Sequence, residues 1–185
     1  MTASNQDTNA HIIPTRWLGC HFRSRLEARW AVFFSELGLK WNYEPEGYEL
    51  PSGRYLPDFY IPAWDAFLEM KPLRFAGREP TREEFIECLD TMVRYFKLLD
   101  ELRTVTRVSN AFIVFDPPNG PRGNPIWSCD GIVDEHGRKK HDFGIHFGIS
   151  GPILDTNGFD VMQVKPESKV RKAYITAMEE RFIYR

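Results

Sequence analysis

The chain has 185 residues, of which 42% are hydrophobic and 14% aromatic, and its formal net charge is −2. This length and composition predict one globular domain over residues 1–185, with a sizeable core. A charge so close to neutral excludes an overall basic field for nucleic acid, so any basic surface must be local.

The cysteines and the apolar segments indicate a compartment. Cys20, Cys88 and Cys129 are widely spaced and form no CxxC motif, which favours free thiols in a reducing cytosol over a disulfide scaffold. The first residues are polar and include no charged segment followed by an apolar run, so we expect no signal peptide. No apolar stretch approaches membrane-spanning length. The expected location is the cytoplasm, without a membrane partner.

The first predicted element is a helix over residues 22–37. Its apolar residues recur at helical spacing, and Gly38 is suited to end it. They are Phe22, Leu26, Trp30, Phe33, Phe34 and Leu37. Charged residues, among them Arg23 and Glu27, lie on the flank of this stripe.

Three strands are predicted next. The first covers residues 41–50, where Pro45 indicates an edge or a bulge. Its acids could approach a metal site, but edge-strand gatekeepers are the favoured interpretation. Residues 51–54 form a hairpin turn, and strands over 55–61 and 66–71 follow, joined by a turn at 62–65.

Alternation along residues 66–71 assigns the side chains to two faces. Phe67, Glu69 and Lys71 share one face, and Leu68 and Met70 share the other. If the strands over 55–61 and 66–71 pair, Asp58, Glu69 and Lys71 converge at one end of a small sheet.

The chain continues with a loop over residues 72–80, a long helix and a buried strand. Thr81 and Glu84 form a capping box for a helix that runs to about Leu102. The apolar run Asn110–Phe115 predicts the strand. The predicted order is helix, three strands, helix, strand.

The last third combines a variable extension over residues 117–164 with a closing helix over 166–184. The extension contains Cys129, His136, His141 and His146, whose spacing matches no zinc pattern, so structural or surface histidines are favoured. Short strands over 143–149 and 159–164 are expected. The closing helix has a local surplus of positive charge that could follow a nucleic-acid backbone. A solvated packing helix explains that charge equally well.

Two carboxylates beside a lysine suit a specific chemistry. Carboxylate oxygens are preferred ligands of Mg²⁺. A lysine next to them can orient or deprotonate the attacking water, or neutralise charge that develops at a phosphate. The triad Asp58, Glu69 and Lys71 is therefore a candidate site for phosphodiester hydrolysis.

The motifs Pro57-Asp58 and Glu69-Met70-Lys71, separated by ten residues, resemble the PD-(D/E)XK nuclease superfamily. Three further segments resemble a bacterial and phage branch of it: R-S-R-L-E-A-R-W near Glu27, Y-E-P-E-G after Asn42, and R-K-A-Y in the closing helix. The resemblance implies an α/β restriction endonuclease-like fold. Its αβββαβ core would span about residues 20–116, with a mixed central sheet flanked by helices, a C-terminal extension and a closing helix.

The resemblance also implies roles. Asp58, Glu69 and the backbone carbonyl of Met70 would hold Mg²⁺, for which Mn²⁺ would substitute, and Lys71 would position the attacking water. Glu27 would orient a metal-bound water or serve a second metal site; the alternative is a solvated residue that pairs with Arg23. The expected partner is nucleic acid, with DNA as the expected kind, and the residues expected to contact it are Arg23, Arg74, Arg78, Lys169 and Lys172.

The setting implied by the family branch is a phage or a mobile element. Because many members of the superfamily cut two strands as pairs, a homodimer is a further expectation. One alternative function is a catalytically inactive module on the same fold that binds nucleic acid or a protein. Another is an ordinary α/β domain in which Glu27, Asp58, Glu69 and Lys71 do not converge.

Overall fold

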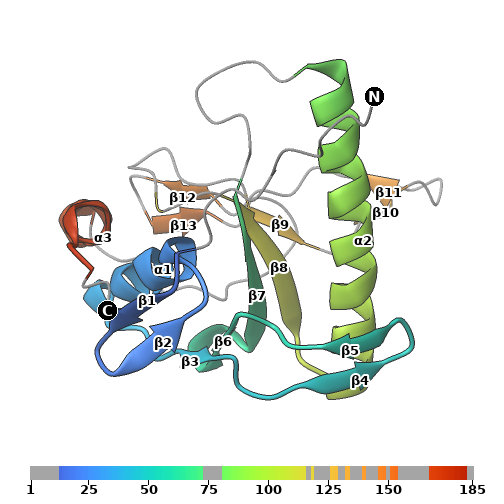
Figure 1. Ribbon diagram of the computed structural model, residues 1–185, viewed down its shortest axis with the longest axis horizontal. Coiled ribbons are helices and arrows are strands. Elements are labelled where there is room, and N and C mark those ends of the chain that lie inside the picture. Colours follow the sequence, from blue (N-terminus) through green and yellow to red (C-terminus); the bar gives the residue numbers. More distant parts are fainter. Residues whose placement is uncertain are drawn as a thin grey trace, which may run out of the picture.

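A five-stranded sheet with the order β3-β6-β7-β8-β9 lies at the centre of the computed structural model (Figure 1). The strands are β3 (Asn42–Tyr43), β6 (Phe59–Ile61), β7 (Ala66–Lys71), β8 (Asn110–Phe115) and β9 (Ile126–Ser128). β7 and β8 run parallel, and the other neighbours are antiparallel, so the sheet is mixed. The structure describes residues 13–72, 81–115, 118, 126–128, 132–133, 139–140, 146–148, 151–153 and 167–182.

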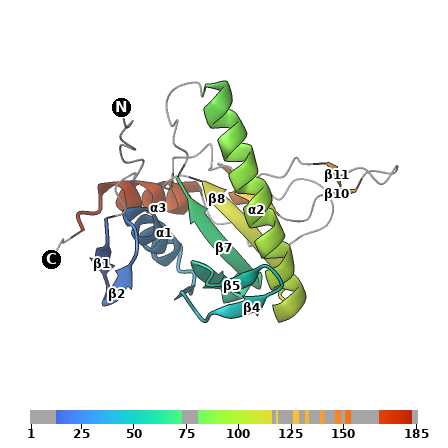
Figure 2. The ribbon, with the colours of Figure 1, turned by 45° about the vertical axis from the view of Figure 1, so that its right-hand side comes forward.

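Helices cover both faces of this sheet. α1 (Arg25–Glu36) and α3 (Glu167–Glu179) lie on one side of β7 and β8, and α2 (Arg82–Thr106) lies on the other (Figure 2). Leu68 and Met70 pack in the core beneath α1, whereas Phe67 packs in the core beneath α2. The predicted alternation along β7 is therefore confirmed, and the molecule has a three-layer, mixed α/β arrangement.

Along the chain, the elements of the central layers follow the order α1, β3, β6, β7, α2, β8. This is the predicted order of helix, three strands, helix and strand. Both β7 and β8 have the bounds that the sequence predicted. The closing helix α3 lies within the predicted range but is shorter.

Capping residues set the ends of α1 and α2. Ser24 and Glu27 form a capping box, so α1 begins after Ser24 and not at Phe22, which belongs to β2 (Cys20–Phe22). Thr81 and Glu84 cap α2 as predicted. α2 continues one turn past the predicted end and stops at Arg107, which adopts a left-handed conformation.

Two predicted strands are each interrupted. The strand expected over 41–50 is divided into β3 and β4 (Tyr48–Leu50), and β4 pairs only with β5 (Gly53–Tyr55) in a separate hairpin. The strand expected over 55–61 is likewise divided between β5 and β6. Prolines at 45 and 57 lack the N–H that a continuous ladder needs, which explains both breaks.

Shorter elements complete the description. β1 (Thr15–Trp17) pairs with β2, and a 3₁₀ turn, η1 (Pro62–Trp64), joins β6 to β7. β10 (Ile132–Val133) pairs with β11 (Lys139–Lys140), and β12 (His146–Gly148) pairs with β13 (Gly151–Ile153). β12 covers part of the strand predicted over 143–149, and the strand predicted over 159–164 lies outside the described residues. Within the described ranges, no helix is both long and apolar enough to cross a membrane.

Candidate functional site

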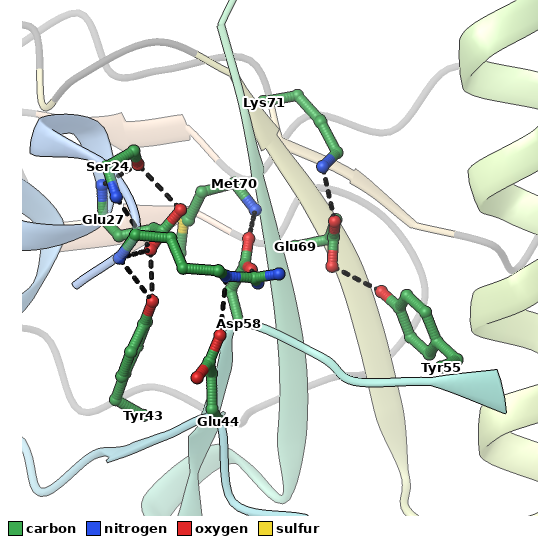
Figure 3. A network of polar contacts seen from close by, with 10 residues as sticks. Ser24, Glu27, Tyr43, Glu44, Tyr55, Asp58, Glu69, Met70 and Lys71 are labelled. Atoms are coloured by element: carbon green, nitrogen blue, oxygen red, sulfur yellow. Dashed lines mark hydrogen bonds and ion pairs between the residues drawn. The ribbon is translucent and has the colours of Figure 1, made fainter. Parts of the chain in front are cut away.

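The candidate site lies where β6 begins, β7 ends and α1 begins (Figure 3). Because β6 and β7 are antiparallel, the residue that precedes β6 lies beside the last residues of β7. Asp58 occupies that position, and its Oδ2 accepts a hydrogen bond of 2.7 Å from the backbone N–H of Met70. Asp58 and Glu69 are only 2% and 4% exposed. Two acids are thus buried at one end of the sheet.

Glu69 and Lys71 form a lysine cluster with Tyr55 and Tyr95. Glu69 Oε1 lies 2.6 Å from Lys71 Nζ, and Glu69 Oε2 accepts a hydrogen bond of 2.5 Å from the Tyr55 hydroxyl (Figure 3). Lys71 Nζ also lies 4.3 Å from the centre of the Tyr95 ring, a cation–π distance. Burial lowers the pKa of Lys71, but the carboxylates of Glu69 and Asp58 outweigh burial and raise it above its ordinary value. Lys71 is therefore a positively charged side chain that its neighbours hold in place.

Arg23 and two acids form an arginine cluster. Arg23 Nη2 lies 2.5 Å from Asp58 Oδ1, and Arg23 Nε lies 2.6 Å from Glu44 Oε1. Glu44 has a positive φ of 44°, a conformation that is uncommon outside glycine. Its backbone N–H donates to the carbonyl of Asp58 at 2.9 Å, which holds this conformation beside the site.

Glu27 is buried, and both of its carboxylate oxygens have hydrogen-bond donors. Oε1 accepts from the Ser24 hydroxyl at 2.7 Å, and Oε2 accepts from the backbone N–H groups of Ser24 and Arg23. The Tyr43 hydroxyl also donates to Oε2, at 2.5 Å. The interpretation of Glu27 as a solvated residue is wrong, because the side chain is 7% exposed and caps α1.

The acids at this site outnumber the cations. Among the described residues, four carboxylates, those of Glu27, Glu44, Asp58 and Glu69, face two cations, so the described side chains carry two more formal negative charges than positive ones. Burial of Asp58, followed by the charges of Glu69 and Glu27, raises the pKa of its carboxyl well above the ordinary value. A further cation beside Asp58 would relieve this repulsion.

The oxygen ligands at the site fit a hard divalent cation. Asp58 and Glu69 offer carboxylates, and the carbonyl of Met70 points to the same side of β7 as its N–H, which is toward Asp58. Among the described residues, no three His, Cys, Asp or Glu side chains gather as a metal site. From the described residues, a metal here would have two carboxylates and the Met70 carbonyl as ligands.

The described residues among the expected nucleic-acid contacts lie at two places along α1. Arg23 lies at the site, whereas Lys172 Nζ is 3.3 Å from Glu36, about 13 Å along α1 from Glu27. Lys169 is exposed on α3, beside Lys172. Arg74 and Arg78 lie outside the described residues.

Five residues of the site were not assigned to it from the sequence: Ser24, Tyr43, Glu44, Tyr55 and Tyr95. The segment Y-E-P-E-G contains a signal for Glu44, because the acids of this segment could approach a metal site. The favoured interpretation, an edge-strand gatekeeper, does not describe Glu44, which pairs with Arg23.

Comparisons of the chain with protein-family models, with curated proteins and with solved structures find no match.

Proposed function

We propose that this protein is a Mg²⁺-dependent nuclease that hydrolyses phosphodiester bonds, with DNA as the expected substrate. The observation that carries the proposal is the burial of Asp58 and Glu69 at one end of the sheet, beside Lys71, with negative charge in excess. Charged acids are rarely buried without a compensating partner. Carboxyls whose pKa is strongly perturbed are found more often at functional sites than elsewhere in proteins.

Each residue has a role in this proposal. Asp58, Glu69 and the Met70 carbonyl would hold the Mg²⁺, which when bound supplies charge to polarise a phosphate and acidify a water. The Lys71 ammonium orients the attacking water and stabilises negative charge that develops on the phosphate oxygens. Glu27 holds the start of α1 and the backbone of Arg23 beside Asp58. Water adds to phosphorus as the bond to the 3′-oxygen breaks, which leaves a 5′-phosphate and a 3′-hydroxyl.

The alternative function is a catalytically inactive binding module, and one observation favours it. Asp58 and Glu69 are already paired, with Arg23 and Lys71 respectively. Such pairs also occur in a network that only stabilises the fold. The excess of carboxylates over cations among the described residues weighs against this alternative, because unbalanced charge destabilises a network that is only structural.

The proposal is tested by incubating the purified chain with linear duplex, supercoiled plasmid, single strand, four-way junction and RNA. Each substrate is combined with Mg²⁺, Mn²⁺ or EDTA. We expect cleavage with either metal, none with EDTA and none by Asp58→Asn. Folded wild-type protein that cuts no substrate with either metal would favour the binding module instead.

A further inference from the structure

Of the two cations at the site, Arg23 is the more exposed to solvent. Its side chain is 53% exposed although its guanidinium contacts both Asp58 and Glu44. The Lys71 side chain is only 24% exposed, because it lies between Glu69 and the ring of Tyr95. Arg23 can therefore leave Asp58 without opening the core, whereas Lys71 cannot leave Glu69 so easily.

The backbone of Arg23 is fixed while its side chain extends to the surface. Its N–H donates to the Tyr43 hydroxyl at 2.9 Å and to Glu27 Oε2 at 3.1 Å, directly before the Ser24 cap of α1. Exposed side chains change rotamer rapidly. The guanidinium can thus turn toward solvent from an anchor that does not move.

Departure of Arg23 would leave Asp58 buried without its counter-ion. Asp58 is 2% exposed, and the charges of Glu69 and Glu27 repel its carboxylate. A buried charge without a partner is strongly unfavourable, so either a proton or a second cation must take the place of the guanidinium. A divalent cation held by Asp58 meets that need, and Arg23 competes with it for the same carboxylate.

We infer that Arg23 is an exchangeable counter-ion that couples the binding of a nucleic-acid phosphate to the binding of a divalent cation at Asp58. A guanidinium matches phosphate in charge and in bidentate geometry, so a phosphate at the site draws Arg23 away from Asp58. The coupling is reciprocal: metal at Asp58 frees Arg23 for phosphate, and phosphate frees Asp58 for metal. The inference rests on the proposed function and adds to it a coupling between metal binding and phosphate binding.

The first test measures Mn²⁺ binding to the full chain by electron paramagnetic resonance, without nucleic acid. Arg23→Gln removes the competitor and should bind Mn²⁺ about tenfold more tightly than wild type. Arg54→Gln is the matched control, because Arg54 is an exposed arginine on β5 whose Nε lies 2.8 Å from Glu49, and it should bind Mn²⁺ as wild type does. Adding Asp58→Asn to Arg23→Gln should abolish the binding.

Unchanged or weaker Mn²⁺ affinity in Arg23→Gln, with a circular dichroism spectrum like that of wild type, would overturn the inference. Arg23→Lys keeps the positive charge, so it provides a second test of the inference if Arg23→Gln does not fold. A single ammonium competes less well than a guanidinium that contacts two acids, so its Mn²⁺ affinity should fall between those of wild type and Arg23→Gln. A Mn²⁺ affinity equal to that of wild type in both variants counts against the exchange.

The second test measures the affinity for a labelled DNA duplex by fluorescence anisotropy, in EDTA or in Ca²⁺, which takes the same oxygen ligands. Ca²⁺ should tighten DNA binding by wild type more than by Arg23→Gln, and equal gains would contradict the coupling.

The outcomes separate the two proposals. Cleavage by wild type with no Mn²⁺ effect of Arg23→Gln removes the inference and keeps the nuclease. Tighter Mn²⁺ binding by Arg23→Gln without any cleavage keeps the exchange at Asp58 and removes the nuclease.

Discussion

The arginine cluster and the lysine cluster lie at the same end of the sheet, yet they hold their acids in opposite ways. In the lysine cluster, Lys71 is partly buried between Glu69 and Tyr95, and a second donor, Tyr55, fixes the other oxygen of Glu69. In the arginine cluster, the cation comes from the surface to a buried acid.

This difference separates a permanent charge from an exchangeable one. The hydrogen bonds and the aromatic ring around Lys71 fix a positive charge where the proposed chemistry needs it. The exposed guanidinium of Arg23 neutralises Asp58 at little cost in packing, so it can be replaced. The proposed metal site must be stable without a metal and must still admit one. A fixed cation on one acid and a removable cation on its neighbour meet both needs.

The largest expected effect comes from removing the fixed cation. Lys71→Ala should lower the cleavage rate by about a hundredfold to a thousandfold, as the loss of one oriented charge-stabilising group does in other enzymes. Lys97→Ala is the matched control, because Lys97 lies on the surface of α2, 3.8 Å from Glu101. The rates are compared on the substrate that wild type cuts best. Equal rates for Lys71→Ala and wild type would exclude a catalytic role for Lys71.

The next effect concerns the donor that fixes Glu69. Tyr55→Phe removes a buried hydrogen bond to a carboxylate and should lower the free energy of unfolding by about 2 kcal/mol. It should also slow cleavage, because Glu69 loses its orientation. Tyr48→Phe removes a hydroxyl that donates to Glu46 at the surface of the same hairpin, and should cost less than about 0.5 kcal/mol. Urea denaturation of both variants measures the two losses in the free energy of unfolding. Equal losses would mean that the hydrogen bond to Glu69 contributes no more than the surface bond to Glu46.

The two capping boxes allow a similar comparison. Ser24→Ala and Thr81→Ala should each lower the free energy of unfolding by about 1 kcal/mol, because each leaves backbone N–H groups of a helix start without an acceptor. Only Ser24→Ala should also slow cleavage, since Ser24 holds Glu27 beside the arginine cluster. If both variants cut at the wild-type rate, the cap of α1 has no part in the site.

The smallest expected effect is a gain in stability. Burial and neighbouring acids raise the pKa of Asp58 in the folded state, so its contribution to stability is present at acid pH and is lost as the pH rises through that raised pKa. Asp58→Asn in EDTA should therefore raise the Tm at pH 7 by about 2 °C. The gain should disappear below the ordinary pKa of an aspartate.

Asp90→Asn, on an exposed position of α2, is the control for that measurement and should leave the Tm unchanged. A Tm for Asp58→Asn well below that of wild type at pH 7 would show instead that the pair with Arg23 dominates.

The sequence predicted the helices and strands whose formation depends on residues close together in the chain. The run Asn110–Phe115 and the alternation along residues 66–71 predicted β8 and β7, because buried strands need little more than apolar residues in the right order. Thr81 and Glu84 predicted the start of α2. The equivalent pair Ser24 and Glu27 was present in the sequence too, but the apolar stripe that begins at Phe22 placed the start of α1 too early.

The rest of the site depends on contacts between distant segments. The positive φ of Glu44 and its pair with Arg23 follow from how the end of β3 meets the start of β6, which no local pattern contains. Tyr55 reaches Glu69 only because the β4–β5 hairpin leaves the main sheet. The convergence of Asp58 with the end of β7 could be predicted, because strand pairing fixes it. The partners of Asp58 could not.

The most direct test of a metal held by Asp58 and Glu69 is anomalous diffraction from crystals of the protein soaked in Mn²⁺. We expect an Mn²⁺ peak within about 2.2 Å of a carboxylate oxygen of each acid and of the Met70 carbonyl. The guanidinium of Arg23 should have turned away from Asp58. A map without an Mn²⁺ peak at this place, with Arg23 still paired to Asp58, would contradict the account.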